Sequence, residues 1–290
     1  MGSSKSIILL LVLCYAMWGG GMIAMKYAFA SFAVMHVVFA RVAFAGLLYL
    51  ALLPKWRHIP YQKGDWKYLI VMVAFEPCLF FLCETFSMKY TTASQGGVIA
   101  ACFPMCTALA AWLFLKEKLN RRTIIAIFFA VLGVAGTSFF AEGDLRASNP
   151  LLGNALMFGA VLSSSGYAVC VRFISRRYSF LSISAIQALG GTIAFLPFLF
   201  SSPFPQSVTL PALGGLLYMG FGVGFVVYLC FNFSLSHLEA GVVALFGNLI
   251  PIFTLIFAYL FLDEHLNSLQ LASVGLTLLG VFIATGRSSE

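Results

Sequence analysis

The chain is a succession of long apolar stretches separated by short polar ones. Each stretch approaches the about 20 residues that a helix needs to cross a bilayer, and none alternates with period two as barrel strands do. The polar connections, of which 54–66 and 141–150 are the longest, are too short for a soluble domain. The pattern predicts ten transmembrane helices, at about residues 7–28, 34–53, 67–88, 92–115, 122–140, 150–172, 179–200, 211–235, 240–262 and 268–286.

A segment of the first half of the chain returns in the second half. The stretch 114–120, FLKEKLN, reappears as FLDEHLN at 261–267, an offset of about 147 residues, close to half the chain. At this offset, about 15 of some 49 paired positions from 86–134 and 233–281 are identical, which indicates an internal repeat. We therefore expect two repeats, residues 1–143 and 148–290, with five helices in each.

Composition excludes a soluble protein. Hydrophobic residues make up 61% of the 290 positions and charged residues 9%, whereas a soluble domain carries about 25% charged residues. The fold class is therefore all-α integral membrane, with the lipid bilayer as a partner. The seven cysteines fall inside predicted spans and lack the paired spacing of a metal site. Catalytic and ATP-binding motifs are missing too, so we expect no metal, no cofactor and no enzymatic activity.

The net charge of +7 is distributed unevenly between the two ends of the predicted helices. The end opposite the N-terminus receives mainly Lys89 and Arg146, with Lys26 near the end of its helix. Most bases lie on the side of the N-terminus, and an excess of Lys and Arg marks the cytoplasmic side of a membrane protein. The distribution therefore predicts a multi-pass protein of the plasma (inner) membrane with both termini cytoplasmic. It also predicts no nucleic-acid partner. The bases on the N-terminal side are Lys5, Lys55, Arg57, Lys63, Lys67, Lys116, Lys118, Arg121, Arg122, Arg172, Arg176, Arg177 and Arg287.

The repeated loop reverses its charge between the two copies. It reads Lys116-Glu117-Lys118 in the first repeat and Asp263-Glu264-His265 in the second. Five crossings per repeat place the second copy upside down relative to the first, and the positive-inside rule then requires this reversal. The sequence therefore predicts two inverted five-helix repeats.

The chain resembles the drug/metabolite transporter superfamily, EamA type, a family of ten-helix carriers. Departures are Ile250, where family members often have an acidic residue, and Glu76-Pro77 and Glu84, which are not general family features. The resemblance implies a membrane transporter and leaves the substrate open. The matching features are Trp18-Gly19, Lys26, Arg41, Phe103-Pro104, the stretch 115–119, Gly133-Val134, Ile250-Pro251, the stretch 262–266 and Gly280-Val281.

Glu76 is the side chain that costs the most free energy to place in the membrane, because it is ionisable and lies near the middle of the span 67–88. An ionisable group at that depth usually faces a cavity or a partner, and Pro77 after it removes a helical hydrogen bond. Glu76 is thus a candidate site for a proton or an amine; the alternative is a structural, protonated carboxylic acid. Glu84 is a further candidate for binding substrate or an ion, although a structural pairing with Lys26 or Lys89 is the favoured interpretation.

Arg41 is the one base deep inside a predicted span. At such a position an arginine must face protein, water or an anion. Two interpretations stay open: Arg41 binds the carboxylate of a substrate, or it forms a structural ion pair with Glu76 or Glu84.

Other candidates are polar, aromatic or helix-breaking residues within apolar spans. Pro104 and Pro251 stand at equivalent places in the two repeats, where broken helices would free backbone groups for a substrate; packing kinks are the alternative. Aromatic rings in the cavity could stack on a ligand, although core or lipid-facing positions explain single aromatics equally well. The remaining candidates are Trp18, Gln95, Tyr167, Tyr228, Asn232 and Asn248.

Together these observations predict a secondary-active transporter that exports a small metabolite, such as an amino acid, by alternating access between its halves. Protons are a candidate coupling ion, and both a monomer and a dimer are compatible with ten spans in one chain. A nucleotide-sugar or phosphorylated-sugar carrier is an alternative. Such a carrier needs several bases in its cavity, and Arg41 is the clear candidate for a base there. A membrane enzyme and a channel are alternatives of a different class. An enzyme requires clustered catalytic residues at one membrane face, which the sequence does not show, and a channel requires a continuous pore.

Overall fold

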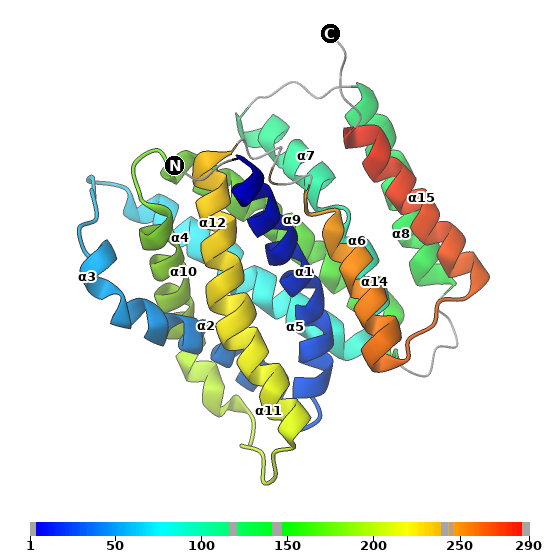
Figure 1. Cartoon of the computed structure of the whole chain (residues 1–290), viewed down its shortest axis with the longest axis horizontal. Helices are drawn as coiled ribbons and strands as arrows, with labels where there is room; N and C mark the ends of the chain where they lie inside the picture. Colours follow the sequence, from blue (N-terminus) through cyan, green and yellow to red (C-terminus); the bar gives the residue numbers. More distant parts are fainter. Residues whose placement is uncertain (1–3, 116–120, 141–146, 239–242, 244–245, 286–290) are drawn as a thin grey trace.

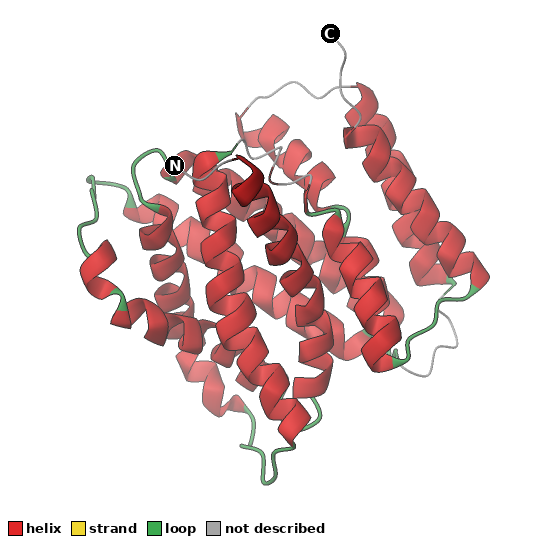
Figure 2. Cartoon of the chain, viewed as in Figure 1, coloured by secondary structure: helices red, strands yellow, loops and turns green. Residues whose placement is uncertain are grey.

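A computed structural model describes residues 4–115, 121–140, 147–238, 243 and 246–285 as a bundle of helices (Figures 1 and 2). The prediction of an all-α fold is confirmed for this part of the chain, which contains no strand (Figure 2). The elements are α1 (Ser4–Ala28), α2 (Val34–Ala51), α3 (Leu53–Trp56), α4 (Trp66–Val73), η1 (Ala74–Leu79), α5 (Phe80–Tyr90), α6 (Ala93–Ala100), α7 (Phe103–Leu115), α8 (Arg121–Phe139), α9 (Pro150–Ile174), α10 (Phe180–Phe195), η2 (Leu196–Ser201), α11 (Leu210–Leu217), η3 (Tyr218–Val227), α12 (Tyr228–His237), α14 (Leu249–Leu262) and α15 (Ser268–Thr285).

Seven helical stretches are long and apolar enough to cross a membrane. They match the predicted spans within a few residues. The other three predicted spans overlap α8, α14 and α15 in sequence. Part of the span 240–262 lies outside the described residues. A total of ten crossings therefore stays a prediction. The seven stretches are Ile7–Ala28, Val34–Ala51, Trp66–Tyr90, Ala93–Phe114, Pro150–Ile174, Phe180–Ser201 and Leu210–His237.

The distribution of apolar and polar side chains is the reverse of that in a soluble protein. Large apolar side chains point outward, with Leu210 82% exposed and Ile193 75% exposed. Arg41 and Glu76 are fully buried. An apolar exterior suits the hydrocarbon core of a bilayer, where polar groups must find partners inside the protein.

Side-chain caps define where several helices begin. The side chains of Thr92, Asn149, Ser179 and Thr209 each accept a hydrogen bond from the backbone N–H three residues ahead, at 3.1–3.4 Å. Each cap satisfies a donor that the first helical turn leaves unpaired, which contributes about 1 kcal/mol. These polar residues at the ends of apolar runs place the helix boundaries.

Elements of the two halves correspond at the offset of the sequence repeat. The helix α1 corresponds to α9, α2 to α10, α7 to α14 and α8 to α15, while α4–η1–α5 corresponds to α11–η3–α12. The packing repeats as well, because α1 packs against α14 as α9 packs against α7. The helices α2 and α10 pack on each other, and so do α8 and α15, which lie side by side in Figure 1.

Both prolines of the repeat begin a helix after a break. A turn at Ala101–Cys102 separates α6 from α7, and Pro104 lies in the first turn of α7. A turn at Gly247–Asn248 precedes α14, and Pro251 lies in its first turn. Proline is tolerated there because the first turn has no intrahelical partner for its missing N–H. The helices are therefore interrupted before the prolines.

Candidate functional site

Glu76 lies at the centre of the candidate site. Its backbone is extended, with φ −146° and ψ 117°, within the π-helical segment η1, and the Glu76–Pro77 peptide is cis. The hydroxyl of Tyr228 donates a hydrogen bond to Oε1, and the hydroxyl of Ser164 donates to Oε2 at 3.1 Å. Glu76 belongs to the first half of the chain and both donors belong to the second, so this carboxyl group joins the halves.

The helix α9 supports the break around Glu76. Pro77 has no N–H to continue the helical hydrogen bonding, and the carbonyl oxygen of Phe75 accepts a hydrogen bond from Ser163 Oγ at 2.6 Å. Gly166 lets the ring of Phe75 approach, because a Cβ at this position would lie 2.9 Å from the ring. The sequence reasoning missed Ser163 and Ser164, although three consecutive serines at 163–165 in an apolar span were a usable signal.

Arg41 and Glu84 form a buried ion pair beside Glu76. Arg41 Nη1, from α2, lies 2.6 Å from Glu84 Oε2, on α5, and the two side chains are 0% and 2% exposed. The expectation that Glu84 pairs with Lys26 or Lys89 is wrong, and the ion pair between Arg41 and Glu84, which the sequence had left open, is the one observed, because α2 packs against α5 and brings Arg41 to the carboxylate. Lys26 Nζ instead donates to the carbonyl oxygen of Thr91 at 2.5 Å.

Two small cavities flank this group. The first, of about 30 Å³, is lined by Trp18, Glu84 and Ser164 together with apolar side chains, and it has room for one or two water molecules. The second, of about 10 Å³, is lined by Arg41 and Tyr228 among others. Trp18 lines the first cavity and Tyr228 the second, and the centroids of their rings lie 5.4 Å apart. Neither cavity holds a metabolite in this conformation, so binding one requires the helices to move apart.

Tyr167 and Asn232 belong to a polar cluster in the second half of the chain. The hydroxyl of Tyr167 lies 2.7 Å from Gln187 Oε1 and 3.0 Å from Asn232 Oδ1, and its single proton serves one of them at a time. Asn232 Nδ2 donates to Ser184 Oγ at 2.8 Å. Because Gln187 and Ser184 also line the second cavity, this cluster supports one of its walls.

Gln95 and Asn248 lie apart from the Glu76 group. Gln95 Oε1 accepts hydrogen bonds from Thr91 Oγ1 at 2.8 Å and Asn154 Nδ2 at 3.0 Å, and it lines neither of the two cavities. Asn248 lies in the turn before α14, where the nearby Ile250, rather than Asn248, lines the first cavity. The structure thus brings together Trp18, Arg41, Glu76, Glu84 and Tyr228, and it leaves Gln95 and Asn248 outside.

The repeated glutamate of the second half is a helix cap. Glu264 is buried, and its two carboxylate oxygens accept hydrogen bonds from the N–H groups of Ala93, at 3.1 Å, and Ser94, at 2.8 Å, at the start of α6. A carboxylate at this position satisfies unpaired donors and complements the positive end of the helix. Its counterpart Glu117, with Lys116 and Lys118, lies outside the described residues.

Within the described residues, no group of three or more histidine, cysteine, aspartate or glutamate side chains could hold a metal ion. The ionisable and polar groups at the site are two buried carboxyl groups, one guanidinium group and the hydroxyl groups around them.

A model of the EamA-like transporter family matches residues 5–139 and again residues 151–286. YetK of Bacillus subtilis, named as an uncharacterized transporter, is 28% identical over 216 residues, which cover 73% of this chain and 66% of YetK. A protein of Archaeoglobus fulgidus with the same description is 25% identical over 287 residues, 97% of this chain and 98% of its own. One solved crystal structure has the same fold, with a TM-score of 0.66, 15% identity, and coverage of 98% of this chain and 97% of that chain.

Proposed function

Because the chain belongs to the EamA-like transporter family, we propose that it is a secondary transporter that exports a small metabolite, such as an amino acid, by alternating access. The resemblance inferred from the sequence motifs is confirmed by the two family matches. The relatives are named as transporters. Direction, energy source and substrate belong to the proposal.

The observation that carries the proposal is the position of Glu76 between the two halves. As a carboxylate, Glu76 accepts hydrogen bonds from Tyr228 and Ser164, both in the second half. A proton on Glu76 turns one acceptor oxygen into a donor, and a bound amine competes with the two hydroxyl groups. Either event changes a contact between the halves, and a ligand shifts a conformational equilibrium when it binds the two states differently.

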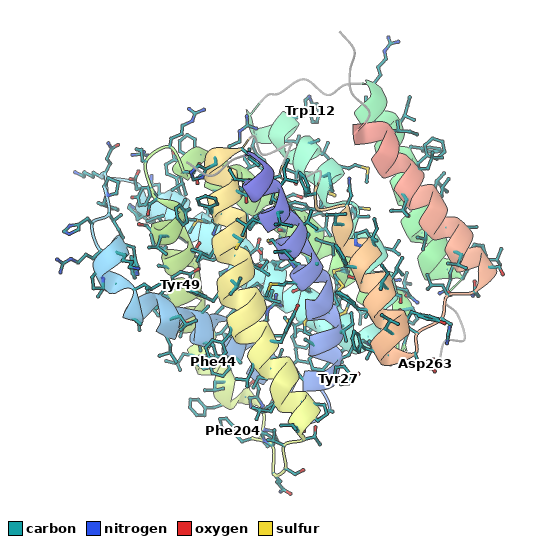
Figure 3. The ribbon with its side chains drawn as sticks, viewed as in Figure 1. Tyr27, Phe44, Tyr49, Trp112, Phe204 and Asp263 are labelled. Carbon is teal, nitrogen blue, oxygen red and sulfur yellow. The ribbon has the colours of Figure 1, made fainter. Side chains whose placement is uncertain are left out.

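The positions of the helix ends support inverted orientations of the two repeats, 1–143 and 148–290, in the membrane. Trp112, near the end of α7, and Asp263, after the corresponding helix α14, lie at opposite edges of the molecule (Figure 3). The helix α1 begins, and α15 ends, at the same edge (Figure 1). Combined with the excess of bases on the N-terminal side, this supports cytoplasmic termini in the plasma (inner) membrane.

The sugar-carrier alternative fits the site less well. A nucleotide-sugar or phosphorylated-sugar carrier needs several bases to neutralise its phosphate groups. Among the described residues, Arg41 is the one base that lines the second cavity, and no base lines the first. A phosphate group would add negative charge beside the carboxyl groups of Glu76 and Glu84 without the compensating ammonium group that an amino acid brings.

The test is the variant Glu76→Gln, measured by counterflow and by pH-gradient-driven uptake in liposomes. The amide keeps the shape of the side chain but binds no proton, so we expect driven accumulation of amino acids to fall by about 10-fold or more. Saturable counterflow by the parent protein distinguishes a carrier from a channel. Asp263→Asn, the same change at a surface carboxylate 82% exposed, is the control and should transport normally. Transport by Glu76→Gln with unchanged rate and pH dependence would reject the role of Glu76.

A further inference from the structure

The guanidinium group of Arg41 is only partly used by the protein. Its Nη1 donates to Glu84 Oε2 at 2.6 Å, whereas Nε and Nη2 are buried without a hydrogen-bond partner among the described residues. Buried donors of a charged group are normally all paired, because an unpaired donor loses its hydrogen bonds to water without gaining a replacement. The two remaining donors of Arg41 therefore call for a partner that the described side chains do not supply.

The two unpaired nitrogens form one edge of the guanidinium plane. Nε and Nη2 point the same way, and this edge binds a carboxylate through two parallel hydrogen bonds. Glu84 occupies the end of the group at Nη1, and the ring of Phe81 covers one face, with its centroid 3.8 Å from Cζ. The side chain is thus held from two directions, and its bidentate edge is presented in a fixed orientation.

The second cavity lies along Arg41. Its lining includes Ser184 and Gln187 from α10 and Tyr228 from α12, which supply polar groups from the second half of the chain. Its volume of about 10 Å³ accommodates about one water-sized group, so a carboxylate enters only after the halves separate slightly. Tyr228 also donates to Glu76, so a molecule bound at Arg41 lies next to the group that we propose takes up a proton or an amine.

We propose that the Nε–Nη2 edge of Arg41 binds the carboxylate of the transported molecule, and that the substrates are amino acids recognised as zwitterions. The inference rests on the proposed transport function and adds the group that recognises the substrate and the charged form in which the substrate binds. Arg41 and Glu84 neutralise each other, which leaves Glu76 as the acid that receives the ammonium group. The carboxylate of a zwitterion pairs with Arg41 and its ammonium group pairs with Glu76. The zwitterion therefore adds no net charge to a buried site.

The test compares neutral amino acids with their carboxamides, which keep the amine and side chain but lose the carboxylate. Stabilisation of the purified protein against heat gives the apparent affinity of each compound. We expect the parent protein to bind the acids at least about 10-fold more tightly than the carboxamides, since a bidentate charged pair is lost in the amide.

Variants assign this preference to Arg41. The double variant Arg41→Gln/Glu84→Gln removes both charges together, so that no unpaired buried charge remains to prevent folding; its preference for acids should vanish. Glu84→Gln alone keeps Arg41 and should keep the preference. If Arg41 were only a structural partner of Glu84, the double variant would retain the preference of the parent protein.

Counterflow in liposomes separates this inference from the transport function. Acid-selective binding that depends on Arg41, without counterflow, would support the carboxylate site and reject transport. Counterflow with equal binding of acids and carboxamides would support transport and overturn the carboxylate site, as would an acid preference that survives in the double variant. Absence of stabilisation by every amino acid tested would also overturn it.

Discussion

Asp65 shows how one charged residue ties two loops together at the edge of the bundle. Its carboxylate accepts hydrogen bonds from the Gln62 N–H at 3.0 Å and the Tyr178 hydroxyl at 2.8 Å, and Arg177 Nη2 lies 2.9 Å away. Burial by itself raises the pKa of Asp65, but the hydrogen bonds and the charge of Arg177 outweigh it and hold the pKa below its ordinary value. Burial and donation to Asp65 raise the pKa of Tyr178 to about 12.

These two shifts predict how stability depends on pH. The contribution of Asp65 is complete above its unfolded pKa of about 3.9 and is lost as pH falls through the lowered folded pKa. The contribution of Tyr178 is complete below its unfolded pKa of about 10 and is lost as pH rises toward 12. Asp65→Asn should therefore lower the unfolding temperature in detergent at neutral pH and flatten its decline below about pH 4. A decline identical to that of the parent protein would contradict this assignment.

At the scale of the elements, glycines decide how closely helices meet around the site. A Cβ on Gly224, in η3, would lie 2.3 Å from the backbone oxygen of Arg41, and one on Gly191, in α10, would lie 2.3 Å from Pro77 Cγ. The two contacts are counterparts under the repeat, because η3 meets α2 in the first and their counterparts η1 and α10 meet in the second. Because the oxygen of Arg41 is part of the backbone, no rotation of a side chain can relieve the first contact.

The variant Gly224→Ala should push η3 away from α2. We expect a loss of about 1–3 kcal/mol of stability, as for other overpacked positions, seen as a lower unfolding temperature in detergent. Gly214→Ala is the matched control in the neighbouring helix α11, because nothing lies within 4 Å of the position that its new methyl group would take. That change should be neutral or stabilising by up to about 1 kcal/mol. Equal stability of the two variants would show that the close approach of η3 and α2 is not required.

At the scale of the whole molecule, the distribution of bases and the edges at which the repeated loops lie predict its orientation. His58 follows α3 in the loop rich in bases, and His265 follows α14 in the acidic copy of the repeated loop. Both side chains are exposed. The positive-inside rule places the first on the cytoplasmic side and the second on the opposite side.

A matched pair of cysteine variants tests this orientation. A membrane-impermeant thiol reagent applied to intact cells should label His265→Cys and spare His58→Cys until the cells are opened. The parent protein controls for its own cysteines, all of them buried or half-buried. Labelling of His58→Cys in intact cells, or of both variants equally, would contradict the orientation.

The helices, the repeat and the family could be predicted from the sequence because each rests on a local or periodic property. A run of apolar residues must be helical in a bilayer whatever its neighbours are, so α1 and α9 were located within a few residues. The partners of Glu84 could not be predicted in this way. Lys26, Lys89 and Arg41 were all within plausible reach, and the packing of α2 on α5 selected Arg41.

The class of protein, the boundaries of most helices and the presence of an ionisable group in the middle of a span, Glu76, all follow from local properties of the sequence. The groups that contact this acid depend on the packing of distant helices, because Ser164 and Tyr228 lie 88 and 152 residues away along the chain. Hydrophobic length is a property of each segment alone, whereas hydrogen bonds between segments depend on which helix faces come together. The same packing left one edge of Arg41 without a hydrogen-bond partner among the described residues, and we propose that this edge binds the carboxylate of the substrate.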